Sequence, residues 1–208
     1  MRYDVIVVGA GPAGSTTARE CAGRGLSVLM LDKAEFPRDK PCGGGVTVRA
    51  AKLLPLDFSD VIERVAVGMR LTCRGSHVLT RYSEEDLVYF TQRRRLDAFL
   101  AERAAASGSN FRQRCAVRAV ERDSSGVGVF TDEGAFHGDA LVVADGANGR
   151  TAEMAGIHVG ATRSIALEGN ITPPGGVPAE WSDVFGLDIG SPPGGYGWAF
   201  PKGDHLNI

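Results

Sequence analysis

The sequence predicts an α/β chain in which a parallel sheet, interrupted by a β-meander, is combined with an antiparallel, β-rich second domain. Apolar, β-branched runs at residues 3–8, 26–31 and 140–144 end in glycine or an acidic residue, which is typical of strands buried on both faces of a parallel sheet. Apolar residues alternate over residues 61–90, and glycine-rich turns separate the apolar runs beyond residue 163. These two features predict antiparallel strands.

The strongest motif begins the chain. The first apolar run leads into Gly9-Ala10-Gly11-Pro12-Ala13-Gly14, which fits G-x-G-x-x-G. In that motif Gly9 permits a tight turn, Gly11 lets the backbone approach a pyrophosphate, and Gly14 lets a helix pack closely on the strand. The following pattern predicts a helix over residues 12–24, with Pro12 in its first turn and Gly25 as its stop. Its sheet-facing side is expected to carry small residues, namely Ala13, Thr17, Ala18 and Cys21.

A second strand, over residues 26–31, ends in Asp32. An acidic side chain there can accept hydrogen bonds from ribose hydroxyls, while the helix N-terminus favours phosphates. The alternative is a glycine-rich turn without a ligand. The unbroken order of strand, turn, helix, stop, strand and acid favours a Rossmann-like dinucleotide site.

Composition excludes several classes of function. Lys plus Arg number 23 and Asp plus Glu number 25, so the net charge of −2 gives no electrostatic case for nucleic acid. No apolar run could span a bilayer, and the early core strand leaves no room for a signal peptide. The four cysteines have no metal-ligand spacing. We expect a cytosolic chain with reduced thiols.

Residues 33–40 are polar and predict a loop, after which Pro41-Cys42-Gly43-Gly44-Gly45 precedes a predicted short helix over 46–54 that ends at Pro55. Glycine has no side chain to pack and is costly to order, so packing is not expected to explain this run. A flexible linker is one interpretation, although linkers usually continue such a composition for longer. Close approach of the backbone to a flat ligand is the favoured one.

The hairpin expected over residues 61–90 turns at Arg74-Gly75-Ser76. A helix is predicted over 91–107, with Gly108 as its stop and an apolar stripe formed by Leu96, Phe99, Leu100 and Ala104. Arg93 lies in the first turn, where it opposes the helix dipole. An anionic ligand and plain solvent exposure explain it equally well.

Strands are then expected over residues 110–120, 127–131, 135–137 and 140–144, the first three as a meander. Because ligands bind at the carboxyl ends of parallel strands, Asp145-Gly146 should face the same crevice as the first glycine motif. Further strands are expected over 165–171, 184–189 and 196–201. The aromatic last strand is either an ordinary strand with an apolar inner face or, as we favour, a wall for an apolar or planar ligand.

Together these motifs resemble the flavin-dependent geranylgeranyl reductases, within the fold group of p-hydroxybenzoate hydroxylase. Four stretches carry the resemblance, which covers essentially the whole chain. They are Gly9–Gly14 with Asp32, Lys40–Gly45, Ala144–Ala147 and Tyr196–Lys202. The first and third occur in many FAD enzymes, and the second and fourth are more specific to the reductases.

The resemblance implies an FAD-binding domain over residues 1–60 and 91–160, and an incomplete substrate domain over 61–90 and 161–208. It implies that FAD is held by the first glycine motif (Gly9, Gly11, Ala13, Gly14), by Asp32 and Lys33, and by Arg93, which lies four residues before Asp97. The other implied FAD contacts are the loop at Cys42, Gly43 and Gly45, the backbone of Val117, and Asp145-Gly146. Tyr196, Trp198 and Phe200 would line the substrate cavity.

The implied activity is FAD-dependent reduction of C=C bonds in a geranylgeranyl or polyprenyl group of a lipid, quinone or chlorophyll precursor, with NADPH or another reductant as electron donor. Such a substrate suggests contact with the membrane surface. Cys42 is the candidate proton donor, with Tyr196 as a second choice. A monooxygenase or halogenase of the same fold and a non-catalytic dinucleotide-binding fragment are the alternatives.

The family carries a further flavin motif, a Gly-Asp followed by small residues, beyond the aromatic stretch. No such motif occurs before Ile208. We therefore expect the 208 residues to be the N-terminal part of a longer enzyme.

Overall fold

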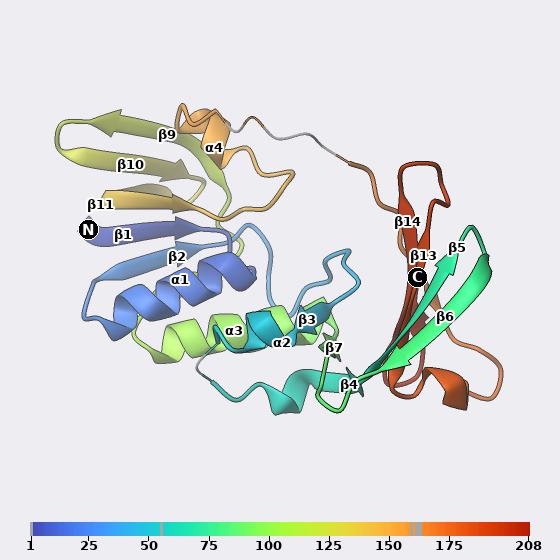
Figure 1. Cartoon of the computed structure of the whole chain (residues 1–208). Coiled ribbons are helices and arrows are strands. Elements are labelled where there is room, and N and C mark those ends of the chain that lie inside the picture. Colours follow the sequence, from blue (N-terminus) through green and yellow to red (C-terminus); the bar gives the residue numbers. More distant parts are fainter. Residues whose placement is uncertain (1, 55, 159, 161–163) are drawn as a thin grey trace. The chain divides into compact units, whose positions relative to one another are not determined.

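The computed structural model describes residues 2–54, 56–158, 160 and 164–208. Contacts divide the chain into two compact units (Figure 1). Unit 1 comprises Met1–Asp39 and Arg94–Ser164, and unit 2 comprises Lys40–Arg93 and Ile165–Ile208. Residues 40–60, expected in the first domain, belong to unit 2 because β3 (Gly45–Thr47) pairs with β7 (Val88–Thr91).

Unit 1 is built on a sheet with the strand order β8-β2-β1-β11-β10-β9. Parallel pairing joins β8, β2, β1 and β11, and antiparallel pairing joins β11, β10 and β9. The mostly parallel sheet with a meander is therefore confirmed. Its strands are β1 (Arg2–Val8), β2 (Val28–Leu31), β8 (Asn110–Arg112), β9 (Val117–Asp123), β10 (Gly126–Thr131) and β11 (Gly134–Val143).

Alternation along β1 explains how this sheet is covered. Val5 and Val7 point to the face that packs on Ala18 of α1 (Pro12–Gly23) and Ala104 of α3 (Arg93–Ala106). Ile6 and Val8 point to the other face, where the core includes Val127 and Val129 of the meander strand β10. Because both faces are covered, residues 5–8 of β1 are apolar at consecutive positions rather than at every second one.

Three expectations for unit 1 were wrong. The strand expected over residues 110–120 is two strands, β8 and β9, which lie at opposite edges of the sheet. The strands expected at 135–137 and 140–144 are one continuous strand, β11. Ala13 is exposed rather than sheet-facing, and the buried residues of α1 are Gly14, Ser15 and Ala18. A short helix, α4 (Thr151–Met154), was not anticipated.

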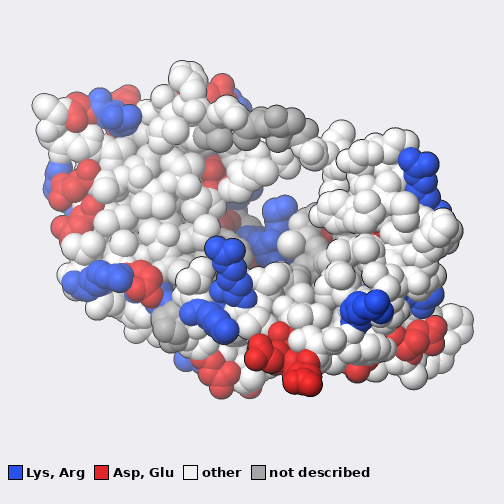
Figure 2. Space-filling view, in the orientation of Figure 1, with Lys and Arg blue, Asp and Glu red and all other residues white. Residues whose placement is uncertain are grey.

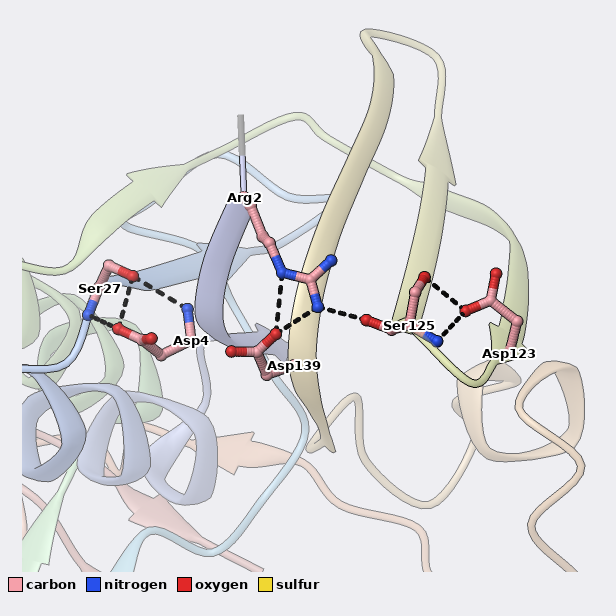
Figure 3. Close-up of polar contacts among 6 residues, drawn as sticks. All are labelled: Arg2, Asp4, Ser27, Asp123, Ser125 and Asp139. Carbon is pink, nitrogen blue, oxygen red and sulfur yellow. Dashed lines mark hydrogen bonds and ion pairs between the residues drawn. The ribbon is translucent and has the colours of Figure 1, made fainter.

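At the amino end of β1, polar contacts tie neighbouring segments together (Figure 3). The carboxylate of Asp4 accepts from the backbone N–H and the hydroxyl of Ser27, both at 2.7 Å. The guanidinium of Arg2 donates to Asp139 on β11 and to the carbonyl of Ser125. These exposed contacts lie at the opposite end of β1 from the glycine turn.

Unit 2 holds one sheet with the order β12-β15-β14-β13-β5-β6 and another with the order β3-β7-β4. The strands not yet given are β4 (Ile62–Ala66), β5 (Gly68–Cys73), β6 (Ser76–Tyr82), β12 (Asn170–Ile171), β13 (Val184–Ile189), β14 (Tyr196–Pro201) and β15 (Leu206–Asn207). Short helical turns are α2 (Val48–Ala51), η1 (Ser59–Val61) and η2 (Ala179–Trp181).

The hairpin expected between residues 61 and 90 is confirmed as β5 and β6, turning at Arg74 and Gly75, both of which have positive φ. The helix expected over residues 46–54 is largely wrong. Residues 45–47 pair as β3 and leave only α2, whose start is capped by the Thr47 hydroxyl. Of the strand expected over 165–171, only β12 is formed, and Ile165 and Leu167 are almost fully exposed.

Basic and acidic side chains are interspersed on the face drawn in Figure 2, as the balanced composition predicts. Among the described residues, no helix is long and apolar enough to cross a bilayer. The described part of the chain also shows no cluster of three or more metal-ligating side chains.

Candidate functional site

The glycine turn after β1 is sterically determined by its neighbours. Gly9 has φ +100°, and a Cβ placed on it would lie 2.3 Å from the carbonyl oxygen of Ala144, which follows β11. A Cβ on Gly14 would lie 1.7 Å from the carbonyl oxygen of Gly9. Gly11 is the N-cap of α1, and Pro12 opens the helix. The tight turn and close helix–strand packing predicted from the motif are therefore confirmed.

Asp32 lies at the end of β2 and is mostly buried. One carboxylate oxygen accepts from the N–H of Ala10 in the glycine turn at 2.8 Å, and the other accepts from the N–H of Ala34 at 2.8 Å. Asp32 therefore pins the glycine turn to β2, a role that the motif did not suggest. An ionised carboxylate has about four acceptor sites, so capacity for ribose hydroxyls remains. The ribose contact stays a prediction, as does any contact of the exposed Lys33.

The Asp145-Gly146 segment lies against the first glycine motif, as expected. The N–H of Ala144 donates to the carbonyl of Val8 at 2.8 Å, and a Cβ on Gly9 would lie 2.8 Å from the Cα of Asp145. The Asp145 carboxylate turns toward α4, where it accepts from the hydroxyl of Thr151 at 2.7 Å and from its N–H at 3.1 Å. Its carboxylate thus caps α4, while its backbone lies against the glycine turn.

The segment that leads to Val117 runs beside Asp32. The N–H of Asp32 donates to the carbonyl of Arg112, and the N–H of Cys115 donates to the carbonyl of Asp32, both at 2.9 Å. Burial raises the pKa of the Cys115 thiol, which lies in the core. Val117, two residues on, is therefore close in sequence to the residues flanking the proposed ribose position. Its contact with the adenine remains a prediction.

Asp97 of α3 is fully buried and forms an ion pair with Arg38, whose nitrogen lies 2.9 Å from the carboxylate. A buried carboxylate of this kind needs a cation nearby, since an isolated buried charge is very costly. Sequence analysis missed Arg38, which lies in an irregular loop far along the chain from α3. Arg93 is the half-buried first residue of α3, and its contact with a cofactor stays a prediction.

In unit 2, the Pro41–Gly45 loop packs tightly on its own unit. A Cβ on Gly43 would lie 2.7 Å from the ring of Phe200, and a Cβ on Gly44, which has φ +65°, would lie 2.0 Å from the carbonyl oxygen of Thr91. The expectation that packing does not explain this glycine run is therefore wrong for Gly43 and Gly44. The thiol of Cys42 is exposed at the start of the loop and lies 3.5 Å from the N–H of Gly44. Approach of a flavin to the loop remains a prediction.

Sequence analysis also missed Lys202, which follows β14 and is 2% exposed. Its ammonium donates to the carbonyls of Gly43 at 2.6 Å and Thr91 at 2.8 Å. Burial is the main reason that the pKa of Lys202 falls from 10.5 to about 8. The basic residue at the end of the aromatic motif is visible in the sequence, but nothing local indicates that it folds inward.

One face of the large sheet of unit 2 is largely apolar, and we call its apolar members the apolar platform. Arg81, opposite Met69, and Asn207, opposite Phe200, also lie on this face. Register places Leu187 beside Trp198 and Leu71, and Leu71 beside Leu79, so these side chains share one face. At one end of the platform the rings of Phe90, Phe185 and Phe200 pack together, with centroids 4.9 to 6.0 Å apart. Its members are Met69, Leu71, Leu79, Phe185, Leu187, Ile189, Tyr196, Trp198 and Phe200. All of them are partly or largely exposed.

The structure therefore brings the predicted residues together in two groups. Gly9, Gly14, Asp32 and Asp145 meet in unit 1. Gly43, Trp198 and Phe200 meet in unit 2, where a Cβ on Gly43 would also lie 3.4 Å from the indole nitrogen of Trp198. That nitrogen donates to Asn207 at 2.8 Å.

Comparison with known proteins assigns the class. The family described as FAD binding domain matches residues 2–183, so the chain belongs to that family. The chain is 36% identical to a menaquinone reductase of Mycolicibacterium smegmatis, covering 100% of this chain and 54% of the relative. It is 31% identical to digeranylgeranylglycerophospholipid reductase 1 of Methanothermobacter thermautotrophicus, with 98% and 54% covered. The chain thus spans about half the length of the curated relatives it matches.

A solved structure of a geranylgeranyl bacteriochlorophyll reductase-like protein from Thermoplasma acidophilum superposes with a TM-score of 0.81 at 25% identity. The match covers all of this chain and 56% of that one. The FAD-dependent chondrochloren halogenase of a myxobacterium superposes with a TM-score of 0.75 at 21% identity, covering 99% and 51%. The second likeness shows a shared fold alone. The resemblance to the geranylgeranyl reductases and the predicted fold class are confirmed.

Proposed function

We propose that this chain is the FAD-binding part of a reductase that acts on C=C bonds of a polyprenyl group carried by a quinone or a lipid. The apolar platform is the observation that carries the proposal. A polyprenyl tail offers only hydrocarbon for recognition, so its binding depends on apolar area removed from water, at roughly 25 cal/mol per Å². A largely apolar sheet face ending at a glycine loop suits such a tail better than it suits a small polar substrate.

FAD fits the residues of unit 1. The positive φ of Gly9 and the absence of a side chain at Gly11 leave backbone N–H groups at the start of α1 able to reach a pyrophosphate. We expect Gly9, Gly11, Ala13 and Gly14 to hold the pyrophosphate, and Asp32 with Lys33 to hold the adenosine ribose. Further contacts are expected from Arg93, Val117, Asp145 and Gly146, and from Cys42, Gly43 and Gly45 beside the flavin ring.

The chemistry requires two groups to be delivered to one double bond. Bound FAD, reduced by NADPH or another reductant, supplies a hydride equivalent. An isolated alkene has no carbonyl to polarise, so the chain must exclude water and place a proton donor at the second carbon. Cys42 is our candidate for that donor, because its thiol is exposed on the loop that is seated against Phe200. Tyr196, whose side chain is largely exposed on the platform, is the second candidate.

The first experiment is a flavin absorbance spectrum of the purified chain, followed by titration with FAD. We expect a bound, oxidised flavin. If none binds at high FAD concentration, the titration is repeated on the chain extended to the length of its relatives. Failure of that protein to bind FAD would refute the assignment.

Substrate class is tested by anaerobic reoxidation of the reduced flavoprotein with a prenylated quinone, a prenylated glycerolipid and the same quinone without its tail. The two prenylated compounds test the quinone and lipid sources separately, and the saturated product is identified by mass spectrometry. The matched variants Leu79→Asn and Val78→Asn are adjacent and exposed on β6 but point to opposite faces. Only Leu79→Asn, on the platform, should raise KM for prenylated substrates.

The shared fold with halogenases makes an oxygen-activating enzyme the second candidate. Rapid oxygen consumption with NADPH, together with failure to saturate any prenyl tail, would favour it. A non-catalytic dinucleotide-binding role is favoured if FAD binds but the extended chain turns over neither substrate. Because prenylated quinones and lipids reside in membranes, the proposed reductase is expected to contact a membrane surface, which vesicle sedimentation tests.

A further inference from the structure

Lys202 is a buried cation that joins two separate segments of unit 2. Its ammonium donates to the Gly43 carbonyl of the Pro41–Gly45 loop and to the Thr91 carbonyl at the end of β7. The same ammonium lies 5.2 Å from the centre of the Phe90 ring, within cation–π range. A single side chain therefore fixes the position of the loop relative to β7.

The backbone on either side of this side chain is held as well. The N–H of Lys202 donates to the carbonyl of His205 at 2.8 Å, and its carbonyl accepts from the guanidinium of Arg64 on β4 at 3.0 Å. The loop also packs on β14, because Gly43 lies against the ring of Phe200. The backbone contacts fix the main chain at Lys202, from which the side chain extends to the loop.

The charge on Lys202 is sensitive to its surroundings. Burial lowers its pKa to about 8, and electrostatic contributions from Glu63 on β4, Cys42 in the loop and Glu168 ahead of β12 oppose this change. The other charged or titratable neighbours are Arg64 and His205. Above that pH the side chain is a neutral amine that still has two N–H donors. An exposed lysine keeps its proton up to about pH 10.5, so raising the pH between these two values favours the state in which Lys202 is buried.

We propose that Lys202 is a positioning residue that holds the Pro41–Gly45 loop against β7 and β14, and that loss of its proton strengthens this hold. The proposal deepens the proposed function, on which it rests for the statement that this loop borders the flavin. Its geometric part concerns unit 2 alone. The loop is then held less firmly at neutral pH, where the buried ammonium is charged, and more firmly in mildly alkaline solution.

The N–H of Thr91 is the natural reporter, because it donates to the carbonyl of Gly44 at 2.9 Å and belongs to a fully buried residue. Amide hydrogen exchange, corrected for its intrinsic pH dependence, is followed for Thr91 between pH 7 and pH 9.5 without flavin. In the unmodified chain we expect protection of Thr91 to rise several-fold as the pH increases through about 8, because the buried lysine holds its proton less tightly than an exposed one. In Lys202→Met it should be at least tenfold lower at pH 9.5 and should show no such rise.

The matched control is Lys52→Met, which makes the same substitution at an exposed lysine of unit 2 and should leave Thr91 protection unchanged. Amides of β13 serve as the reference for global unfolding, and Cys42→Ser in both backgrounds removes the neighbouring thiol. Lys202→Arg retains the charge and should abolish the step near pH 8. Unchanged Thr91 protection in Lys202→Met, or a step near pH 8 that persists in it, would overturn the proposal. If Lys202→Met does not fold, the pH titration of the unmodified chain with Cys42→Ser decides alone.

FAD titration of the same proteins then judges the proposed function separately. We expect FAD affinity to fall about tenfold in Lys202→Met and to be unchanged in Lys52→Met. If Thr91 protection responds as expected but FAD affinity does not, the loop is seated by Lys202 and the assignment of this loop to the flavin site is wrong. If Thr91 protection does not change in Lys202→Met, the proposed role of Lys202 is wrong, whether or not FAD affinity changes.

Discussion

The chain contains two glycine-rich segments that differ in what determines them. The turn Gly9–Gly14 is shaped mainly by the strand before it and the helix after it, because Gly14 lies against the carbonyl of Gly9. Gly9 in turn lies against Ala144 at the end of β11. The loop Pro41–Gly45 is shaped by groups distant in sequence, namely Thr91, Phe200 and Lys202. A local motif can therefore be interpreted from its spacing, whereas a loop seated by distant residues can be interpreted only after the chain has folded.

The first way to test this comparison is to add one methyl group to the turn. In Gly14→Ala the new Cβ would meet the Gly9 carbonyl oxygen at 1.7 Å, so α1 must move away from β1. We expect a loss of about 4 kcal/mol or more in the free energy of unfolding, at the upper end of single substitutions, and loss of FAD binding. Denaturant unfolding and FAD titration measure the two effects.

Gly23→Ala is the matched control in the same helix, because nothing lies within 4 Å of the added Cβ. It should be neutral or should stabilise by up to about 1 kcal/mol, since alanine orders at lower entropic cost than glycine. Equal behaviour of the two variants would contradict the steric account of the turn.

The loop is tested by Gly44→Ala. Gly44 has φ +65°, and its Cβ would lie 2.0 Å from the Thr91 carbonyl oxygen. We expect a cost of about 2 to 4 kcal/mol from strain and displacement of the loop, with an increased rate of Cys42 alkylation relative to Cys73. Gly169→Ala, also in unit 2 and free of any contact within 4 Å of its Cβ, is the control and should change neither quantity.

Lys202 should give unit 2 a characteristic pH dependence. The unfolded lysine has its ordinary pKa near 10.5, while the folded one has a pKa of about 8. Between these values the unfolded state binds more protons, so the contribution of this group to stability rises as the pH increases from about 8 to 10.5. The difference corresponds to on the order of 3 kcal/mol. Unfolding of the unmodified chain and of Lys202→Met, compared at pH 7.5 and 10, should show the rise only in the former.

The smallest effect is expected at the opposite end of β1 from the glycine turn (Figure 3). The Ser27 hydroxyl and N–H lower the pKa of the Asp4 carboxyl. The stability it contributes is present above the ordinary carboxyl pKa and is lost as the pH falls through the lowered value. Asp4→Asn should therefore slightly lower the thermal midpoint at pH 7 and leave it unchanged at pH 2. A large change at pH 7 would show that this exposed contact matters more than its solvent screening allows.

Several elements followed directly from local sequence. The strand, turn and helix over residues 3–24 were predictable because G-x-G-x-x-G, Pro12 and Gly25 act within a few residues of their own positions. The β5–β6 hairpin was predictable from alternation and from the Arg74-Gly75 turn. The aromatic strand β14 and its apolar face were also anticipated. Of the predicted site, the approach of Asp145 to the glycine turn is confirmed by the parallel pairing of β1 with β11.

Other features depended on partners that no local pattern reveals. The first part of the helix predicted over residues 46–54 is instead strand β3, which pairs with β7. Strand pairing satisfies backbone groups that the end of a short helix would leave unpaired. Residues 110–120 divided into two strands because β8 completes the parallel edge beside β2 while β9 completes the meander. Arg38 pairs with Asp97 although the two are far apart in sequence.

The sequence by itself determined the glycine turn and the order of parallel and antiparallel strands, because each rests on patterns within short segments. Membership in a flavin-binding class followed from the resemblance to a known family. Three contacts depended on tertiary structure alone. Asp32 accepts a hydrogen bond from Ala10 in the glycine turn. Gly43 packs against the Phe200 ring, Gly44 lies against the Thr91 carbonyl, and the buried Lys202 donates to the carbonyls of Gly43 and Thr91. The physical reason is that burial and hydrogen bonding are properties of what surrounds a residue, and here the surroundings come from distant parts of the chain.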